Sequence, residues 1–106
     1  MATFTRSKIA FIQLADSKGD VFATGSNRLI HNIVLHNTNT TTETVELLFH
    51  DGTNEYQLLN RDLVADETYT WGFANEGLYI PSAGKVTGNT TVASKVTCSI
   101  SGSVET

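Results

Sequence analysis

The sequence predicts a single all-β domain: an antiparallel β-sandwich of about seven or eight strands, with jelly-roll or immunoglobulin-like topology. Turn-forming residues recur between apolar segments at roughly the 8–12-residue spacing of short antiparallel strands. Threonine and valine are abundant between these turns, and both are β-branched and suit a pleated surface. A chain of 106 residues with 40% hydrophobic content is long enough for one core. We therefore expect one domain over residues 1–106.

The C-terminal segment shows the clearest strand pattern. Its apolar residues share one parity, and its polar residues share the other: Val92, Val96, Cys98, Ile100 and Val104 against Thr97, Ser99 and Ser101. Such alternation indicates a strand with one buried face. Residues 43–50 repeat it. Residues 53–63 also fit a helical stripe, but the turn at Asp51-Gly52 favours a strand there.

The N-terminal segment superficially resembles a secretory signal, because Arg6 and Lys8 precede the apolar run at residues 9–15. The run is short, contains Gln13 and lacks a convincing cleavage site of small residues. We interpret it as a strand. No apolar stretch approaches the ~20 residues that a membrane-spanning helix needs.

Two segments, residues 9–14 and 29–35, carry apolar side chains on both parities. A strand with two apolar faces is either central in the fold or covered by another subunit. In a small sandwich each sheet has an outward face, which favours the second reading. We therefore expect a subunit or partner interface, and its candidate residues are Ile9, Phe11, Ile30 and Val34.

Charge and cysteine content restrict the partners. Eleven acidic and seven basic residues give a net charge of −4, which disfavours binding to nucleic acid or to anionic membranes. The single cysteine, Cys98, cannot form an internal disulfide, so a reducing compartment is the simplest expectation. Its apolar parity predicts a buried, unreactive thiol.

The sequence offers no catalytic, cofactor-binding or metal-binding set. His31, His36 and His50 lack the spacing of a metal-binding motif, and no cluster of cysteines or carboxylates completes them. Nucleophilic catalysis would need a base and an orienting group near the nucleophile, and no local motif supplies them. We therefore expect a protein that is not an enzyme.

The aromatic residues permit two interpretations. Tyr69, Trp71 and Phe73 share one parity, which favours a row that faces the core. Alternatively, Trp71 and Tyr79 form a platform for a sugar ring, which would make the protein a carbohydrate- or receptor-binding module. Polar residues near the platform would then lie at its edge: Asp66, Asn75 or Glu76.

The order of turns and strands over residues 28–105 resembles that of small structural β-sandwich proteins of tailed bacteriophages. The resemblance rests on the turn that ends Leu35-His36-Asn37-Thr38, on Gly77-Leu78-Tyr79-Ile80, and on the closing strand Val96–Glu105. It implies a non-enzymatic head-decoration (cement) protein that binds and stabilises the shell, or a tail or fibre accessory module. It also implies a homotrimer, with the major capsid protein or a tail protein as partner. The protein would then be found in the virion, after assembly in the host cytoplasm.

Overall fold

The computed structural model describes residues 3–74 and 77–105, and in that part every regular element is a strand. There are nine strands: β1 (Phe4–Gln13), β2 (Gly19–Phe22), β3 (Arg28–Asn37), β4 (Glu43–His50), β5 (Glu55–Leu63), β6 (Thr68–Gly72), β7 (Leu78–Ile80), β8 (Lys85–Thr90) and β9 (Val96–Glu105). The predicted all-β sandwich is confirmed. Residues 55–63 form a strand rather than a helix, and the N-terminal apolar run lies in β1.

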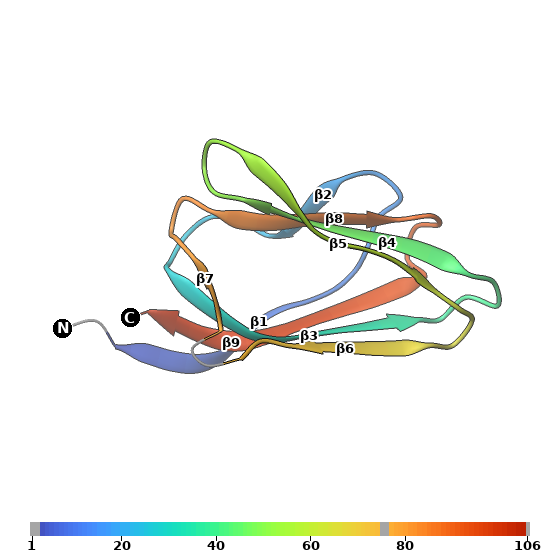
Figure 1. The fold of residues 1–106 in the computed structure, drawn as a ribbon, viewed down its shortest axis with the longest axis horizontal. Coiled ribbons are helices and arrows are strands. Elements are labelled where there is room, and N and C mark those ends of the chain that lie inside the picture. The colour runs from blue at the N-terminus through green and yellow to red at the C-terminus, as the bar shows by residue number, and fades with distance from the viewer. Residues whose placement is uncertain (1–2, 75–76, 106) are drawn as a thin grey trace.

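The strands form two antiparallel sheets that lie one above the other (Figure 1). Sheet A has the order β1-β9-β3-β6, with β7 also paired to β3, and sheet B has the order β2-β8-β4-β5. Because β6 and β7 pair with successive parts of β3, they share one position in sheet A. The pairing is nested: β1 with β9, β2 with β8, β3 with β6 and β7, and β4 with β5.

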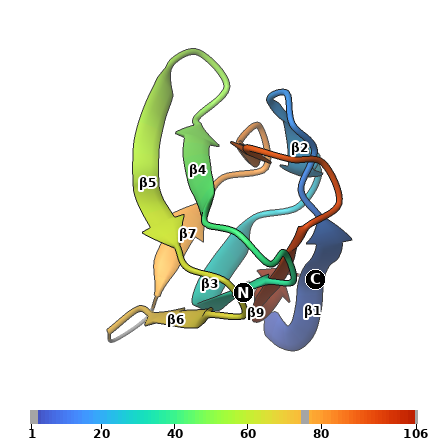
Figure 2. The same cartoon turned by 90° about the vertical axis from the view of Figure 1, so that its right-hand side faces the viewer.

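This nested pairing is that of a jelly roll, in which a long two-stranded ribbon folds over on itself. An immunoglobulin-like sandwich groups its strands differently, with the first, second, fifth and fourth together in one sheet. Of the two topologies that the sequence left open, the observed strand order matches the jelly roll. Figure 2 shows the two sheets end-on, with β5 and β6 at one side of the sandwich and β1 and β2 at the other.

The core lies between the inward faces of the two sheets. It contains Leu14, Ile30, Ile33, Leu35, Val45, Leu47, Leu63, Ile80, Val86, Val96, Cys98 and Ile100, none of which is more than 1% exposed. The alternation predicted for residues 43–50 and for β9 is confirmed at five apolar positions, which are completely buried: Val45, Leu47, Val96, Cys98 and Ile100. Leu48, on the polar parity of β4, is half-buried. Val92 is an exception: it precedes β9 and is exposed.

Two β-bulges, one in β1 and one in β3, change which side chains of these strands point inward. Lys8 pairs with Ser101 and Ala10 with Ile100, so Ile9 is an extra residue in β1. In β3, Ile30 pairs with Gly102 and Asn32 with Ser101, so His31 is extra. A bulge of one residue reverses the parity of every side chain beyond it.

These bulges correct the predicted interface. Ile30 is completely buried in the core of its own chain, and Ile9 is half-buried against that core. The apolar pattern on both parities therefore reflects a shift in register rather than two apolar faces. Phe11 and Val34 remain on the outer face of sheet A, where both pair with Ser99.

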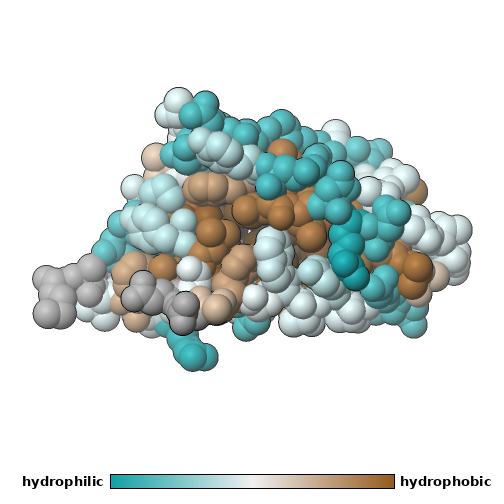
Figure 3. Space-filling model, viewed as in Figure 1, coloured by the Kyte–Doolittle hydropathy of each residue, from teal (hydrophilic) through white to brown (hydrophobic). Residues whose placement is uncertain are grey.

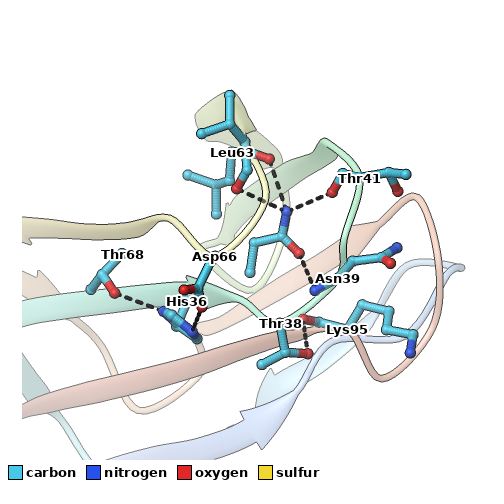
Figure 4. A network of polar contacts seen from close by, with 10 residues as sticks. His36, Thr38, Asn39, Thr41, Leu63, Asp66, Thr68 and Lys95 are labelled. Carbon is cyan, nitrogen blue, oxygen red and sulfur yellow. Dashed lines mark hydrogen bonds and ion pairs between the residues drawn. The ribbon is translucent and has the colours of Figure 1, made fainter.

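A polar cluster closes the end of the sandwich at the β3–β4 turn (Figure 4). The Asn37 side chain donates hydrogen bonds to the carbonyl oxygens of Thr41, Leu63 and Val64, and its Oδ1 accepts one from the N–H of Asn39. Both Asn37 and Glu43 are fully buried.

The Glu43 carboxylate accepts hydrogen bonds from Asn39, Thr90 and the backbone N–H of Val92. Burial alone would raise the pKa of Glu43, but these hydrogen bonds, together with the charge of Lys95, outweigh it and hold the pKa below its ordinary value. Glu43 is therefore a buried carboxylate that remains ionised.

Candidate functional site

The outer face of sheet A carries a depression of about 540 Å³. Its lining comes from three adjacent strands and includes Arg6 and Lys8 of β1, Ser99, Ser101 and Gly102 of β9, and His31 and Asn32 of β3. The small residues of β9 lie between longer side chains on both sides. The volume falls within the range of pockets for small ligands.

The two bulges lie at the same level as this depression. Ser101 of β9 pairs with Lys8 of β1 on one side and with Asn32 of β3 on the other. The extra residue of each bulge is next to that partner in sequence: Ile9 follows Lys8, and His31 precedes Asn32. A Cβ added at Gly102 would collide with the carbonyl oxygen of Leu29 and come within 3.0 Å of Ile9 Cδ1. Only glycine therefore lets the neighbouring strands close on β9 here. Bulges of this kind commonly redirect side chains next to a binding site.

The electrostatics of the depression differ from those of the whole chain. Among the residues that the structure describes, none that lines the depression is acidic, although the net charge of the protein is −4. Elsewhere, Lys18, Lys85 and Arg61 each lie within 4.0 Å of a carboxylate oxygen. Arg6 and Lys8 form no ion pair with residues 3–74 or 77–105. Cationic side chains are thus left free of carboxylate partners on this face.

The polar side chains of the depression differ in whether they form hydrogen bonds within the protein. His31 Nε2 lies 3.3 Å from Ser103 Oγ, a hydrogen bond that fixes the ring. Within the described part of the chain, the side chains of Asn32, Ser99 and Ser101 have no such partner. These groups can donate hydrogen bonds to a ligand without breaking any within the protein.

Phe11 extends this surface on the outer face. It is 62% exposed, the largest exposure among the large apolar side chains of the described residues. Phe11 pairs with Ser99, which lines the depression, and Lys8 Nζ lies 5.2 Å from the centre of its ring. An exposed aromatic ring therefore adjoins the cationic groups.

A second feature is the open side of the sandwich, between β5 and β6. Its half-buried apolar residues are Leu59, Tyr69, Trp71, Phe73 and Leu78. Figure 3 shows an apolar band along this side, between the more polar surfaces of the two sheets. The Trp71 and Phe73 rings lie 4.7 Å apart, and the Arg61 guanidinium covers Tyr69 at 4.2 Å.

The predicted sugar platform at Trp71 and Tyr79 is wrong. Trp71 pairs with the buried residue Ile33, and its side chain packs against the core. Tyr79 adjoins Leu78, which pairs with buried Ile30, so Tyr79 points to the opposite face of the sheet. The two rings therefore cannot contact one ligand. Asn75 and Glu76, expected at the edge of the platform, lie outside the described residues.

The two histidines of β3, as candidate metal ligands, are far apart, and the candidate nucleophiles Ser103 and Cys98 are buried. The bulge brings His31 and His36 to the same face of β3, but five residues of strand separate them by about 16 Å. Among residues 3–74 and 77–105, no three His, Cys, Asp or Glu side chains are arranged to hold a metal ion. Ser103 contacts His31 but is only 8% exposed. Cys98 is buried, and burial raises the pKa of its thiol to about 12.

The residues of the depression that the sequence failed to indicate as a candidate site are Arg6, Lys8, Ser99 and Ser101, because they come together only through the register of three strands. No protein-family model matches the chain, and no match was found among curated proteins or among solved structures. The described residues form no helix that is long and apolar enough to span a membrane.

Proposed function

We propose that this protein is a non-enzymatic structural protein of a tailed-bacteriophage virion and that it decorates and stabilises the head shell. The observation that carries the proposal is the apolar band on the open side of the sandwich. Apolar surface left in water forgoes about 25 cal/mol for each Å² that could be buried. A contiguous band of this kind typically marks a protein–protein contact.

The occupant that we propose for the open side is a second copy of this chain within a homotrimer. In a cyclic ring, one surface of each copy meets a different surface of the next copy, so an open side needs no self-complementary partner. A three-fold ring would also match the three-fold positions of an icosahedral shell. The number three and the shell come from the resemblance to phage decoration proteins.

Light scattering tests the assembly. A trimer would have three times the 11.5 kDa mass of the chain. Replacement of Tyr56 and Phe73 by serine should dissociate it, because Tyr56 is 50% exposed in β5, the edge strand that borders the open side, and Phe73 is half-buried at that side. Val92→Ser is a matched control, since Val92 is an exposed apolar residue outside the strands. A wild-type protein that stays at 11.5 kDa at micromolar concentration would contradict the trimer.

Trp71 provides a second readout, because it is the only tryptophan of the chain and is half-buried at the open side. Its fluorescence should shift to longer wavelength on dilution as the trimer dissociates. The virion role is tested with particles of the phage whose genome carries this gene. Particles that lack the protein should release their DNA at a lower temperature, and the purified protein should restore wild-type resistance. Absence of the protein from purified particles would overturn the proposal.

A further inference from the structure

We infer that the depression on the outer face of sheet A is a binding site for an acidic saccharide of one or two rings. The proposal does not rest on the proposed virion function. It concerns β1, β9 and β3, whereas the open side lies between β5 and β6. Three properties of the depression support it: its charge, its hydrogen-bonding groups and its aromatic neighbour.

The charge indicates an anionic group on the ligand. Arg6 and Lys8 line the depression, and none of the described residues that line it carries a carboxylate. A guanidinium binds a carboxylate, sulfate or phosphate through two parallel hydrogen bonds, and an ammonium adds a compact positive charge. These two cations lack ion-pair partners within the described residues, while Lys18 and Lys85 are paired to Glu55 and Asp20. An oxyanion on the ligand would therefore meet cations that are already free.

The hydrogen-bonding groups indicate a ligand rich in hydroxyls. Ser99 and Ser101 each offer one donor and two acceptor positions, and the Asn32 amide offers both kinds. A sugar ring presents the complementary set around its rim. Gly102 is buried between the neighbouring strands, so the hydroxyl-binding groups of the depression are the side chains of Ser99, Ser101 and Asn32.

Phe11 supplies the apolar contact. A pyranose ring has faces made of C–H bonds, and an exposed aromatic ring can cover one of them while the rim stays hydrogen-bonded. Phe11 is 62% exposed and pairs with Ser99 of the depression. Lys8 Nζ lies over the Phe11 ring, 5.2 Å from its centre, so a cation and an exposed aromatic ring stand next to each other at this edge of the depression.

A nucleic acid fits this surface less well. A phosphate backbone would extend beyond the depression over a protein with a net charge of −4, and this long-range repulsion grows with strand length. A short acidic saccharide places its one or two charges at the two cations and avoids that repulsion.

Calorimetry and amide NMR of the ¹⁵N-labelled wild-type chain test the proposal with four probes: digalacturonate, sialyllactose, neutral lactose and sodium sulfate. We expect at least one acidic saccharide to bind about tenfold or more tightly than lactose and than sulfate, more weakly as salt rises. The amide shifts should centre on Ser99, Ser101 and Gly102.

Variants then locate the site. Arg6→Gln and Lys8→Gln should each weaken binding about tenfold, and Phe11→Ala should weaken it with both charges intact. Lys85→Gln is the matched control, because Lys85 is paired to Asp20 on sheet B, and binding should not change. Arg6 and Lys8 are exposed, so their variants should keep wild-type stability.

Four results would overturn the inference: no acidic saccharide binds at millimolar concentration, lactose or sulfate binds as tightly as the acidic saccharides, a single-stranded oligonucleotide binds more tightly than they do, or the Arg6 and Lys8 variants bind like wild type.

Discussion

Glu43→Ala tests whether the buried carboxylate at the start of β4 stabilises one end of the sandwich. Glu43 is fully buried and accepts three hydrogen bonds, from Asn39 Nδ2 at 2.9 Å, Thr90 Oγ1 at 3.0 Å and the Val92 N–H at 2.8 Å. Alanine removes the acceptor and leaves these donors behind. The Thr90 hydroxyl is buried, so it loses its partner where water is scarce.

The magnitude follows from the donors that lose their partner. A buried group left without a hydrogen bond costs about 1–3 kcal/mol, and disruption of a buried charged network typically costs about 3–5 kcal/mol. The donors at Asn39 and Val92 are only partly buried, so we expect a loss of about 3–5 kcal/mol in the free energy of unfolding rather than the sum of three maxima. For a domain of this size, each kcal/mol lowers Tm by roughly 4 °C, so Tm should fall by about 12–20 °C.

Urea denaturation followed by circular dichroism measures the effect. Glu46→Ala is the matched control: Glu46 lies on the same strand with its carboxylate on the outer face, where it accepts a hydrogen bond from Gln57. The control should change stability by less than about 0.5 kcal/mol. If Glu43→Ala also stays within 0.5 kcal/mol of wild type, the reasoning about the buried cluster is refuted.

A double variant tests the geometry. Glu43→Gln places an amide NH₂ against the Asn39 NH₂, so two donors face each other and stability should fall by about 1–2 kcal/mol. Asn39→Asp added to this variant restores one donor and one acceptor, while its second oxygen can still accept the Thr40 N–H. The double variant should be more stable than Glu43→Gln alone. Simple addition of the two single effects would contradict the contact.

The remaining predictions concern pH, the thiol and a glycine. The pKa of Glu43 in the folded protein lies below its ordinary value of 4.5, so the ionised carboxylate stabilises the fold fully above pH 4.5. This stabilisation is lost as the pH falls through the folded-state pKa. The difference in unfolding free energy between wild type and Glu43→Gln should therefore become smaller below about pH 4.5. Cys98, buried with its pKa raised to about 12, should resist iodoacetamide at pH 8 in the folded protein and react fully in urea; rapid labelling without urea would show that the thiol is accessible. Gly102→Ala should destabilise the fold by about 1–3 kcal/mol, because its Cβ would collide with the Leu29 carbonyl oxygen, whereas Gly19→Ala, with 3.9 Å to its nearest neighbour, should not; equal urea midpoints would argue against this crowding.

Alternation of apolar and polar residues predicted the strands that contain no inserted residue themselves. In β4 and β9 the central inward positions are buried in the structure, and the buried thiol of Cys98 follows from the same parity, whereas Val104 near the end of β9 is half-buried. The preference for a strand at residues 55–63 was correct, because the Asp51-Gly52 turn connects β4 to β5 and the two strands pair as a hairpin.

Alternation failed where one residue is inserted. Ile30 and Ile33 have opposite parities, yet both are buried, because the extra residue His31 lies between them. Nothing in the local sequence of β3 distinguishes this arrangement from a strand with two apolar faces. The information lies in the partner strand, where Gly102 permits a close approach that a side chain would prevent.

The depression could not be predicted for a related reason. Lys8 and Ser101 are far apart in sequence, and they become neighbours only when β1 and β9 adopt their particular register. Periodicity assigns a face to each residue but not a partner strand. The burial of Glu43 was missed likewise, because the donors that make a buried carboxylate tolerable come from two other turns.

The nested pairing of the jelly roll has a consequence for how the chain folds. The innermost pair, β4 with β5, joins residues that are close in sequence, whereas the outermost pair joins Phe4 to Glu105 across nearly the whole chain. Closing a longer loop costs more entropy, so we expect the β4–β5 hairpin to form early and β1 to join last. Since β9 lies between β1 and β3, sheet A lacks a central strand until residues 96–105 have been synthesised. A nascent chain on the ribosome can therefore build much of sheet B before sheet A can be completed.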